Sequence, residues 1–489
     1  MRGLQTPVRA IRRQVFTEVA KLGFKANAET LVADMEAIPY EIVGEDSEVK
    51  YRESIYRARA VVRERLRLAM GLSLRPENKP VHLTAGVEAS NISEKYYEPP
   101  LMQVIPSGCE SCEENKYEVS NVCKGCLAHP CQEVCPRGAI SMVNGKSFID
   151  QDKCIKCGKC KSVCPYDAIA KKERPCKKAC GVNAITSDKL GRAYIDADKC
   201  VSCGMCMVSC PFGAISDKSQ IFQLARALSE GEEIVAEVAP AFVGQFGPNI
   251  NVRNFKAALE ELGFSETYEV ALGADIGAIA EAHHYVNKVT TGELPFLLTS
   301  CCPSWAMLAK KFFPDLIDQI SQELTPMVAT ARTIKQEHPN AKVVFIGPCA
   351  AKKLEAMRRT VRSEVDFVLT FEEMAGIFDA KHVNLETIEE DPAGVNDAST
   401  DGRNFAVAGG VAKAVTNVLK EKYPDLEVKV ANAEGLKECK KMMQLAKAGK
   451  YNGYLLEGMA CPGGCVAGAG TMQAIKKSQA AVNMYANKA

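Results

Sequence analysis

The sequence predicts an α/β domain in its C-terminal half, a small cysteine-rich α+β region before it, and a helical region at the N-terminus. Residues 1–105 contain no cysteine and carry apolar residues at helical spacing. Residues 106–218 hold 16 of the 22 cysteines, and residues 219–489 alternate short β-rich runs with helical patterns. Such alternation is typical of α/β domains with largely parallel sheets.

The composition is that of a globular protein. The chain has 489 residues, of which 47% are apolar and 25% charged, and its formal net charge is +1. This balance points to no nucleic-acid or anionic-membrane partner, and no apolar run is long enough to cross a bilayer. Arg12-Arg13 precedes an amphipathic stretch, so we expect a helix surface here and no export signal.

Two helices are expected in the N-terminal region. The first has a buried stripe formed by Ile11, Val15, Phe16, Val19 and Leu22. The second, within residues 51–72, has an apolar face formed by Ile55, Ala58, Val62, Leu66 and Ala69, and Gly71 ends it. Its other positions carry Arg52, Arg57, Arg59, Arg63, Arg65 and Arg67. These arginines form either a solvated face or a docking surface for an acidic electron carrier.

Six buried strands are expected in the α/β domain. They are Ile234–Val238, Phe296–Leu298, Val343–Ile346, Phe367–Leu369, Phe405–Val407 and Leu426–Val430. Ligand sites in such domains gather where strands end and helices begin.

The cysteines indicate metal binding rather than disulfides. A disulfide framework suits a short secreted chain, whereas thiolates that bind soft metals suit a long chain in a reducing cytoplasm. Two segments have the bacterial ferredoxin spacing, with a fourth cysteine before proline: Cys154, Cys157, Cys160, Cys164 and Cys200, Cys203, Cys206, Cys210. A cysteine followed by proline is not a typical ending for a zinc-binding motif.

An internal repeat predicts four 4Fe–4S clusters in two ferredoxin-like modules. Residues 131–154 and 176–200 are two copies of one unit. In module one, Cys123, Cys126, Cys131 and Cys164 hold one cluster, and Cys154, Cys157, Cys160 and Cys135 hold another. If module one is inserted in module two, Cys109, Cys112, Cys176 and Cys210 hold a third, and Cys200, Cys203, Cys206 and Cys180 a fourth.

This nested order resembles four-cluster electron-transfer subunits of molybdenum oxidoreductases. The alternative pairs Cys154, Cys157 and Cys160 with Cys210, and Cys200, Cys203 and Cys206 with Cys164. In either case the clusters carry electrons between the surface and a buried site.

Three more cysteine motifs lie far apart in the second half of the chain. They are Thr299-Ser300-Cys301-Cys302-Pro303-Ser304-Trp305, Gly347-Pro348-Cys349-Ala350-Ala351-Lys352-Lys353-Leu354-Glu355 and Glu457-Gly458-Met459-Ala460-Cys461-Pro462-Gly463-Gly464-Cys465. The first two follow expected strands, and Pro303 suits the first turn of a helix. Cys461 and Cys465 share a face if their segment is helical. Cys301 and Cys302 point in different directions, which suits one free thiol and one ligand.

In this order and spacing the motifs resemble those of iron-only (FeFe) hydrogenases, over about residues 109–470. The resemblance implies an α/β catalytic domain around a buried metal site, in which protons and electrons are converted reversibly to dihydrogen. Cys302, Cys349, Cys461 and Cys465 would hold a fifth 4Fe–4S cube, which Cys465 bridges to a two-iron unit with carbon monoxide, cyanide and dithiolate ligands. Together these groups form the H-cluster.

The resemblance also implies roles for residues that are not iron ligands. Cys301 would exchange protons with the amine of the dithiolate, and Lys352 would donate to a cyanide. Pro240 and Met459 would lie against the cofactor. Gly409-Gly410 also resembles a cofactor-packing segment. Alternatively, Pro240 and the two glycines form only a turn and a tight helix entry.

The proton path implied by the family runs from the free thiol through a glutamate, a serine and a second glutamate. Glu281 and Ser321 match the first two positions, and His284 stands where the second glutamate is expected. A histidine relays protons near neutral pH, although His283 and His284 are equally well read as ordinary surface residues. Glu355 is either an alternative relay or a structural residue.

Two departures indicate a divergent subclass. The family usually has methionine where Gly347 stands, and the third motif usually continues into Gly-Gly-Gln-Pro rather than residues 468–472. Cys439 is interpreted as a spare thiol on a helix.

The expected partners are a ferredoxin or flavodoxin, and maturation proteins that install the two-iron unit. No Gly-x-Gly-x-x-Gly run follows an expected strand, so no nicotinamide or flavin site is expected. The alternatives are a hydrogen sensor with the same cofactor and an electron-transfer protein without the two-iron unit.

Overall fold

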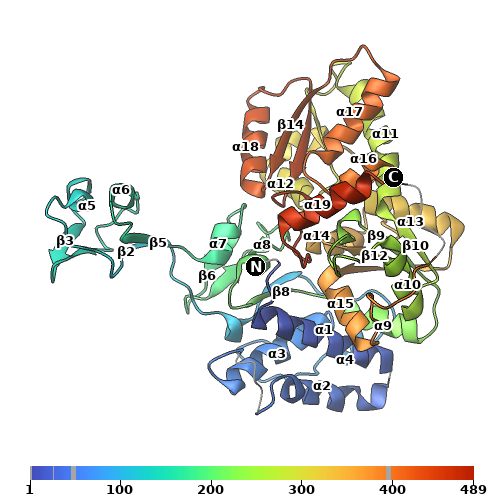
Figure 1. The fold of residues 1–489 in the computed structure, drawn as a ribbon, viewed down its shortest axis with the longest axis horizontal. Helices are drawn as coiled ribbons and strands as arrows, with labels where there is room; N and C mark the ends of the chain where they lie inside the picture. The colour runs from blue at the N-terminus through green and yellow to red at the C-terminus, as the bar shows by residue number, and fades with distance from the viewer. Residues whose placement is uncertain (1–2, 26, 46–50, 392–397, 489) are drawn as a thin grey trace.

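The computed structural model describes residues 3–25, 27–45, 51–391 and 398–488. Figure 1 shows an α/β body with helices of the N-terminal region beneath it and a small cysteine-rich lobe projecting to one side. Among the described residues, no helix has both the length and the apolar character needed to span a bilayer.

The N-terminal helices share the core of the body. They are α1 (Pro7–Lys25), α2 (Ala28–Ile42) and α3 (Ile55–Ala69). The predicted stripe of α1 is buried throughout, and that of α3 is buried except for Ile55, which is 37% exposed. Helix α1 packs against α9 (Ile221–Ser229) and α15 (Phe371–Ala380), so this region lies against the α/β domain.

The body contains two separate parallel sheets. In the first, the strand order is β10 (Glu266–Glu269), β9 (Ile234–Val238), β12 (Lys342–Gly347) and β13 (Phe367–Thr370). In the second, the order is β11 (Leu297–Leu298), β15 (Tyr454–Met459) and β14 (Lys429–Glu434). All neighbouring strands in both sheets run parallel, which confirms the predicted α/β class.

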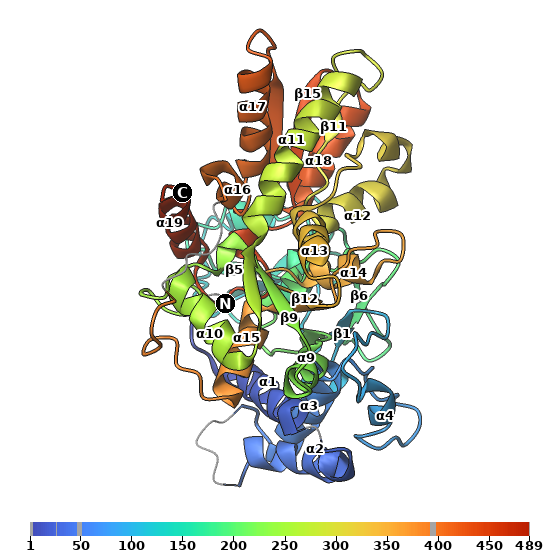
Figure 2. The same ribbon diagram turned by 90° about the vertical axis from the view of Figure 1, so that its right-hand side faces the viewer.

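Helices surround the two sheets and lie between them (Figure 2). The helices of the body beyond α9 and α15 are α10 (Val252–Leu262), α11 (Val270–Lys288), α12 (Pro303–Phe312), α13 (Pro326–Glu337), α14 (Ala350–Met357), α16 (Thr400–Asn404), α17 (Gly410–Lys422), α18 (Leu436–Lys447) and α19 (Ile475–Ala486). Four of them, α11, α12, α14 and α18, begin shortly after a strand ends, at the edge where ligand sites form in parallel sheets.

One predicted strand is wrong and two strands were missed. Residues 405–407 form turns between α16 and α17, because the N–H groups of Phe405 and Val407 donate to carbonyls only three residues back. The expected strand at 426–430 begins at Lys429. Strands β10 and β15 had no predicted counterpart.

The strands of the cysteine-rich region pair in a nested order. The outer pair is β1 (Met102–Val104) with β8 (Ile215–Asp217), and it encloses β2 (Lys116–Val119) with β5 (Ile169–Lys172). Each unit also contains a hairpin. In the outer unit it is β6 (Ile185–Ser187) with β7 (Ala193–Ile195), and in the inner unit it is β3 (Ile140–Val143) with β4 (Lys146–Ile149). Residues 116–172 are therefore inserted within a second unit of the same plan.

Candidate metal centre and cluster loops

A buried cavity lies where strands of both sheets end. Residues that follow β9, β11, β12 and β15 line it, so four carboxyl ends of parallel strands meet at one site. The cavity wall contains the thiol-bearing residues Cys301, Cys302, Cys349, Cys461 and Cys465. The structure thus brings together all three distant motifs.

Local structure fixes the first two motifs. Helix α12 begins at Pro303 with Cys302 at its N-cap, as predicted, and α14 begins at Ala350 directly after Cys349. Each cysteine is therefore held at the rigid junction of a strand and a helix.

The third motif is not helical. Gly463 and Gly464 have φ of +94° and +91°, and only the short 3₁₀ turn Cys465–Ala467 follows. A Cβ on Gly464 would lie 2.5 Å from the backbone nitrogen of Ala408, so glycine is required for this close approach. Cys461 and Cys465 line the same cavity through this turn rather than through a helix face.

The cavity is a poor place for free thiolates. Burial, followed by the other nearby thiols, raises the pKa of Cys349 to about 11 and that of Cys465 to about 12. No cluster of three or more His, Cys, Asp or Glu side chains in the described ranges is placed to hold a single metal ion. A larger metal group that bonds to all four thiolates would offset the cost of burying them.

Lys352 adds a positive charge to the cavity wall. Its Nζ donates to Glu355 Oε2 at 2.5 Å and to Thr325 Oγ1 at 3.1 Å. Burial lowers the pKa of Lys352, but Glu355 outweighs this effect and the pKa is raised overall. Glu355 is therefore placed to hold Lys352 rather than to lead away from the cavity.

Smaller contacts complete the wall. Pro240 and Met459 line the cavity, whereas Gly409 and Gly410 do not. Gly409 instead donates its N–H to the buried carboxylate of Glu457 at 2.7 Å, at the start of α17. The buried Cys439 donates to the carbonyl oxygens of Ala433 and Met459.

The ring of Phe345 occupies the space beside Gly347. A Cβ at Gly347 would lie 2.3 Å from this ring, and Phe345 itself lines the cavity. The family usually has methionine at the position of Gly347. Here the side chain of Phe345, two residues earlier, covers that part of the wall.

Polar residues lead from Cys301 toward the surface. The buried Glu281 carboxyl lies near Cys301 and accepts hydrogen bonds from the Ser321 hydroxyl and the Ser300 N–H. Burial raises the pKa of Glu281 to about 7 despite these bonds. The Ser321 hydroxyl oxygen accepts the backbone N–H of Glu323 at 3.3 Å. The side-chain carboxylate of Glu323 lies 3.5 Å from His284 Nδ1.

Sequence reasoning missed Glu323 in this chain of groups. The side chains of Glu323 and His284 are 36% and 15% exposed, so they stand between the buried pair and solvent. His283 is exposed and contacts Lys422, as an ordinary surface residue does.

The four cluster loops share one backbone conformation. The residue two positions after the first cysteine has positive φ in each, at Ser111, Gly125, Lys156 and Ser202. The N–H of an alanine donates to the cysteine sulfur four residues earlier at Cys135, Cys164, Cys180 and Cys210. Cys109 thus begins a loop of the same kind as Cys123, Cys154 and Cys200.

The grouping of the cysteines follows the nested order. Cys109, Cys112, Cys176 and Cys210 line one pocket, and Cys135, Cys154, Cys157 and Cys160 line another. Cys180 lies with Cys200, Cys203 and Cys206, and both Cys123 and Cys131 contact Ser147. The alternative pairing is not found, because Cys210 lies with Cys109 and Cys176 rather than with Cys154.

One cluster loop abuts the central cavity. Cys203 interacts electrostatically with Cys302 and Cys461, and the Ser304 hydroxyl donates to the Val201 carbonyl at 2.9 Å. A Cβ on Gly204 would lie 2.4 Å from that of Ala469. The loop of Cys200 is therefore the neighbour of the cavity.

Three of the arginines at or just before α3 contact the backbone of the cysteine-rich region. Arg52 donates to the carbonyls of Gly108 and Phe212, Arg57 to those of Ser107 and Cys109, and the buried Arg65 to that of Gly213. These three side chains hold the backbone of the loops around Cys109 and Cys210, so they form neither a solvated face nor a docking surface.

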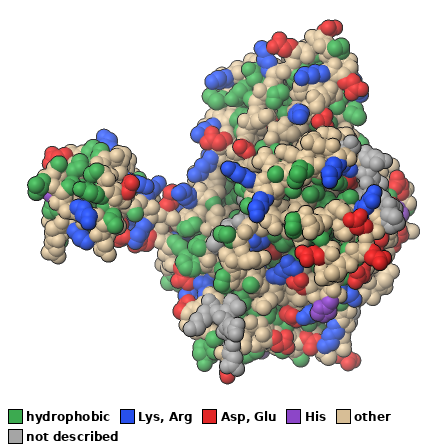
Figure 3. Space-filling view, in the orientation of Figure 1, with side chains coloured by type: hydrophobic (Ala, Val, Ile, Leu, Met, Phe, Trp, Pro, Cys, Tyr) green, Lys and Arg blue, Asp and Glu red, His purple; other side chains and the backbone are tan. Residues whose placement is uncertain are grey.

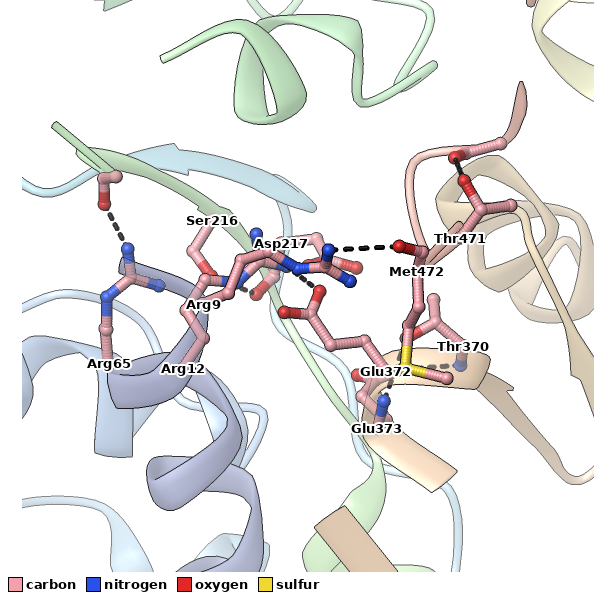
Figure 4. A network of polar contacts seen from close by, with 12 residues as sticks. Arg9, Arg12, Arg65, Ser216, Asp217, Thr370, Glu372, Glu373, Thr471 and Met472 are labelled. Atoms are coloured by element: carbon pink, nitrogen blue, oxygen red, sulfur yellow. Dashed lines mark hydrogen bonds and ion pairs between the residues drawn. The ribbon is translucent and has the colours of Figure 1, made fainter. Parts of the chain in front are cut away.

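A polar network joins α1, the cysteine-rich region and the body (Figure 4). Arg12 pairs with Glu372 at 2.5 Å, and Arg9 donates to the Met472 carbonyl just beyond the third motif. Thr370 and Glu373 form a capping box at the start of α15.

Comparisons with known proteins find related families in three parts of the chain. Residues 232–469 match the family described as "Iron only hydrogenase large subunit, C-terminal domain". Residues 123–173 match "LdpA Fe-S cluster-binding domain", and residues 193–216 match "4Fe-4S binding domain".

Among curated relatives, Iron hydrogenase 1 of Clostridium pasteurianum is 29% identical over 52% of this chain and 52% of its own length. The periplasmic Fe hydrogenase large subunit of Nitratidesulfovibrio vulgaris is 29% identical over 52% of this chain and 72% of its own. The nuclear prelamin A recognition factor of Mus musculus is 25% identical over 50% and 64%. The chain therefore spans only about half the length of the first of these relatives.

A solved structure, a variant of the FeFe-hydrogenase HydA1 from Chlamydomonas reinhardtii, has 24% identity and a TM-score of 0.43. Its match covers 51% of this chain and 84% of that chain.

Fold and site together define an iron–sulfur protein with a thiol-lined centre in an α/β domain. The match over residues 232–469 shows that this part of the chain is a domain of the iron-only hydrogenase large-subunit type. Identities of 29% and below to the hydrogenase relatives make this domain a divergent one.

Proposed function

We propose that this protein is an FeFe hydrogenase that interconverts dihydrogen with protons and electrons, and that it exchanges those electrons with a ferredoxin-type carrier. One observation carries the proposal: Cys301, Cys302, Cys349, Cys461 and Cys465 line a single buried cavity at the ends of parallel strands. A cubane cluster requires four thiolates, so one of the five thiols is left over. The domain that holds them matches the iron-only hydrogenase family model.

The residues present fit the H-cluster. Cys302, Cys349, Cys461 and Cys465 supply four soft thiolate ligands, and Lys352 supplies a cation for an anionic ligand. When bound, the two-iron unit supplies an open metal position and a pendant base at which dihydrogen is formed or split. Pro240, Phe345 and Met459 exclude water from the cavity wall.

The chain's own residues manage the protons. Cys301 holds a transferable proton at the cavity wall, and Glu281 accepts it on the side away from the cavity. Ser321 hydrogen-bonds to Glu281, and the Glu323 carboxylate lies near enough to Glu281 to act on its charge. Glu323 and His284 then form the pair that faces solvent.

The sixteen N-terminal cysteines are proposed to bind four 4Fe–4S cubes in the nested order. Electrons would enter through the projecting lobe, pass the cube of Cys109, Cys112, Cys176 and Cys210, and then that of Cys200, which abuts the cavity. We propose a reducing cytoplasm as the location, because cysteines that bind iron–sulfur clusters must stay reduced.

Infrared spectroscopy, iron analysis and gas measurement test the function together. We expect carbonyl and cyanide bands in protein matured with the two-iron unit, and hydrogen evolution with reduced ferredoxin. Bands without turnover would support a hydrogen sensor instead. Iron–sulfur absorption without bands would support an electron-transfer protein, a candidate favoured by relatives such as prelamin A recognition factor, whose names describe no hydrogenase.

Replacing Cys176 by alanine tests the nested order. We expect about four fewer iron atoms per chain and unchanged carbonyl and cyanide bands, because Cys176 lies with Cys109, Cys112 and Cys210, away from the central cavity. Cys439→Ala is the matched control, since this thiol is assigned to no cluster and bonds to the carbonyl oxygens of Ala433 and Met459. This variant should keep the full iron content. A full iron count in the Cys176 variant would contradict the pairing.

Replacing Glu323 by glutamine tests the outer proton path. We expect turnover to fall about tenfold without a change in the infrared bands, because the amide can no longer carry a proton between the region of Glu281 and solvent. His284→Gln should behave alike, and the double variant should be little worse than either. His283→Gln is the control, and wild-type rates in both single variants would show that protons leave elsewhere.

A further inference from the structure

The lobe formed by residues 116–172 has an unusual surface. Large apolar side chains are strongly exposed on it, including Leu127 at 97%, Ile155 at 56%, Val122 at 55% and Phe148 at 54%. Val143, Val163 and Tyr166 are exposed as well. Exposed apolar groups gathered in this way mark interaction sites in stable proteins.

Exposed large apolar side chains are more frequent in the lobe than in the rest of the described chain. Seven of the 22 large apolar side chains that are exposed among the described residues fall between Val122 and Tyr166. That stretch is less than a tenth of the chain. Figure 3 shows hydrophobic side chains gathered over the visible face of the lobe, with lysines and arginines among them.

The charge of the lobe is positive. Residues 120–167 carry seven lysines and arginines and four acidic residues, whereas the whole chain has a formal net charge of only +1. The basic side chains Lys124, Lys146, Lys153, Lys156, Lys159, Lys161 and Arg137 are all exposed. An acidic partner would be steered to this surface and would be held there by the apolar groups.

The lobe is also the place where a cluster loop comes nearest to solvent. Of the 22 cysteines, all of which the structure describes, Cys157 is the one that is exposed. It lies with Cys135, Cys154 and Cys160 in one pocket, and the neighbouring Ile155 belongs to the apolar surface. A partner bound on this surface would come close to that cysteine set.

From these observations we propose that the lobe is the docking surface for a small acidic electron carrier of the ferredoxin type. The inference rests on the proposed function, which it deepens by naming where the carrier binds and why. Apolar contacts from Leu127, Phe148 and Ile155 provide affinity, and the surrounding lysines provide steering and orientation. Cys135, Cys154, Cys157 and Cys160 would hold the cube that receives one electron from the reduced carrier, and no bond would be made or broken.

The test compares variants of the cofactor-loaded protein. Leu127→Ser/Phe148→Ser removes apolar contacts, Lys146→Glu/Lys161→Glu reverses charge, and Met484→Ser, at an exposed methionine on α19, is the matched control. Titration calorimetry with an acidic two-cluster ferredoxin measures binding without requiring turnover. Hydrogen evolution with that ferredoxin is compared with evolution driven by reduced methyl viologen, a small donor that needs no docking surface.

We expect each lobe variant to weaken ferredoxin binding at least tenfold and to raise the KM for ferredoxin, with unchanged iron content and unchanged viologen-driven evolution. Ferredoxin binding equal to that of the Met484 control would overturn the proposal. A wild-type dimer that the lobe variants convert to monomers would also overturn it, because the surface would then hold a second copy. If no protein evolves hydrogen with either donor while the lobe variants still lose ferredoxin binding, the proposed function fails and the docking surface stands.

Discussion

Replacing Cys301 by alanine is expected to lower hydrogen turnover at least about a hundredfold while the infrared bands of the cofactor stay unchanged. A positioned general acid or base typically contributes 10²–10⁴-fold, and Cys301 is the cavity thiol next to Glu281. Alanine keeps the backbone of the strand-to-helix junction, where Cys302 remains the N-cap of α12. The iron ligands should therefore be retained.

Controls separate proton transfer from loss of the cofactor. Cys439→Ala removes a buried thiol that does not itself line the cavity, and we expect wild-type bands and turnover. Loss of the bands in the Cys301 variant would instead make this residue an iron ligand. Unchanged hydrogen evolution with intact bands would remove Cys301 from the proton path.

Much of the α/β domain was predictable because its central strands are continuous apolar runs. Ile234–Val238 and Val343–Ile346 are buried on both faces, and such strands are typical of parallel sheets. Strand β15 was missed because Glu457 and Gly458 interrupt its apolar run. Glu457 is buried only because its carboxylate accepts N–H groups of Gly409 and Ala412 at the start of α17.

The cluster loops show what spacing alone can predict. Each cube needs four thiols, and this requirement together with the internal repeat predicted that one module is inserted in the other. The strand pairs are nested in the same way, because β1 with β8 encloses β2 with β5. The contacts of Arg52 and of the arginines of α3 could not be predicted from residue spacing. Their partners are backbone carbonyls far away in the chain, which carry no residue-type signal.

The wall of the cavity depended on packing that sequence does not reveal. At Gly347 the motif indicated only a missing side chain, whereas the structure fills that space with the ring of Phe345. Glu323 was missed for a similar reason. It lies two residues after Ser321, and only the fold of that loop brings it to His284.

Lys353 should be the most important single residue for joining the cysteine-rich region to the body. Its buried Nζ donates to Asp217 at 2.7 Å, to the Lys218 carbonyl at 2.9 Å and to Glu373 at 2.7 Å. Burial lowers the pKa of Lys353, but the two carboxylates outweigh it and the pKa is raised overall. Asp217 ends β8, and Glu373 belongs to the capping box shown in Figure 4.

We therefore expect Lys353→Met to destabilise the folded protein by about 3–5 kcal/mol, because two buried carboxylates lose their cation. The measurement is the temperature at which the holoprotein loses helical circular dichroism and iron–sulfur absorption, which should fall by several degrees. Lys441→Met is the control. Its partner Glu438 is exposed, so less than about 1 kcal/mol is expected.

Adding Asp217→Asn to Lys353→Met should restore part of the lost stability, since one uncompensated charge is then removed. The partial recovery follows only if the cost arises from the unpaired carboxylates rather than from the altered shape of the side chain. A Lys353→Met protein that melts at the wild-type temperature would mean that water or a neighbouring group already satisfies Asp217 and Glu373. In that case the junction between β8 and α15 would depend on apolar packing and not on this ion network.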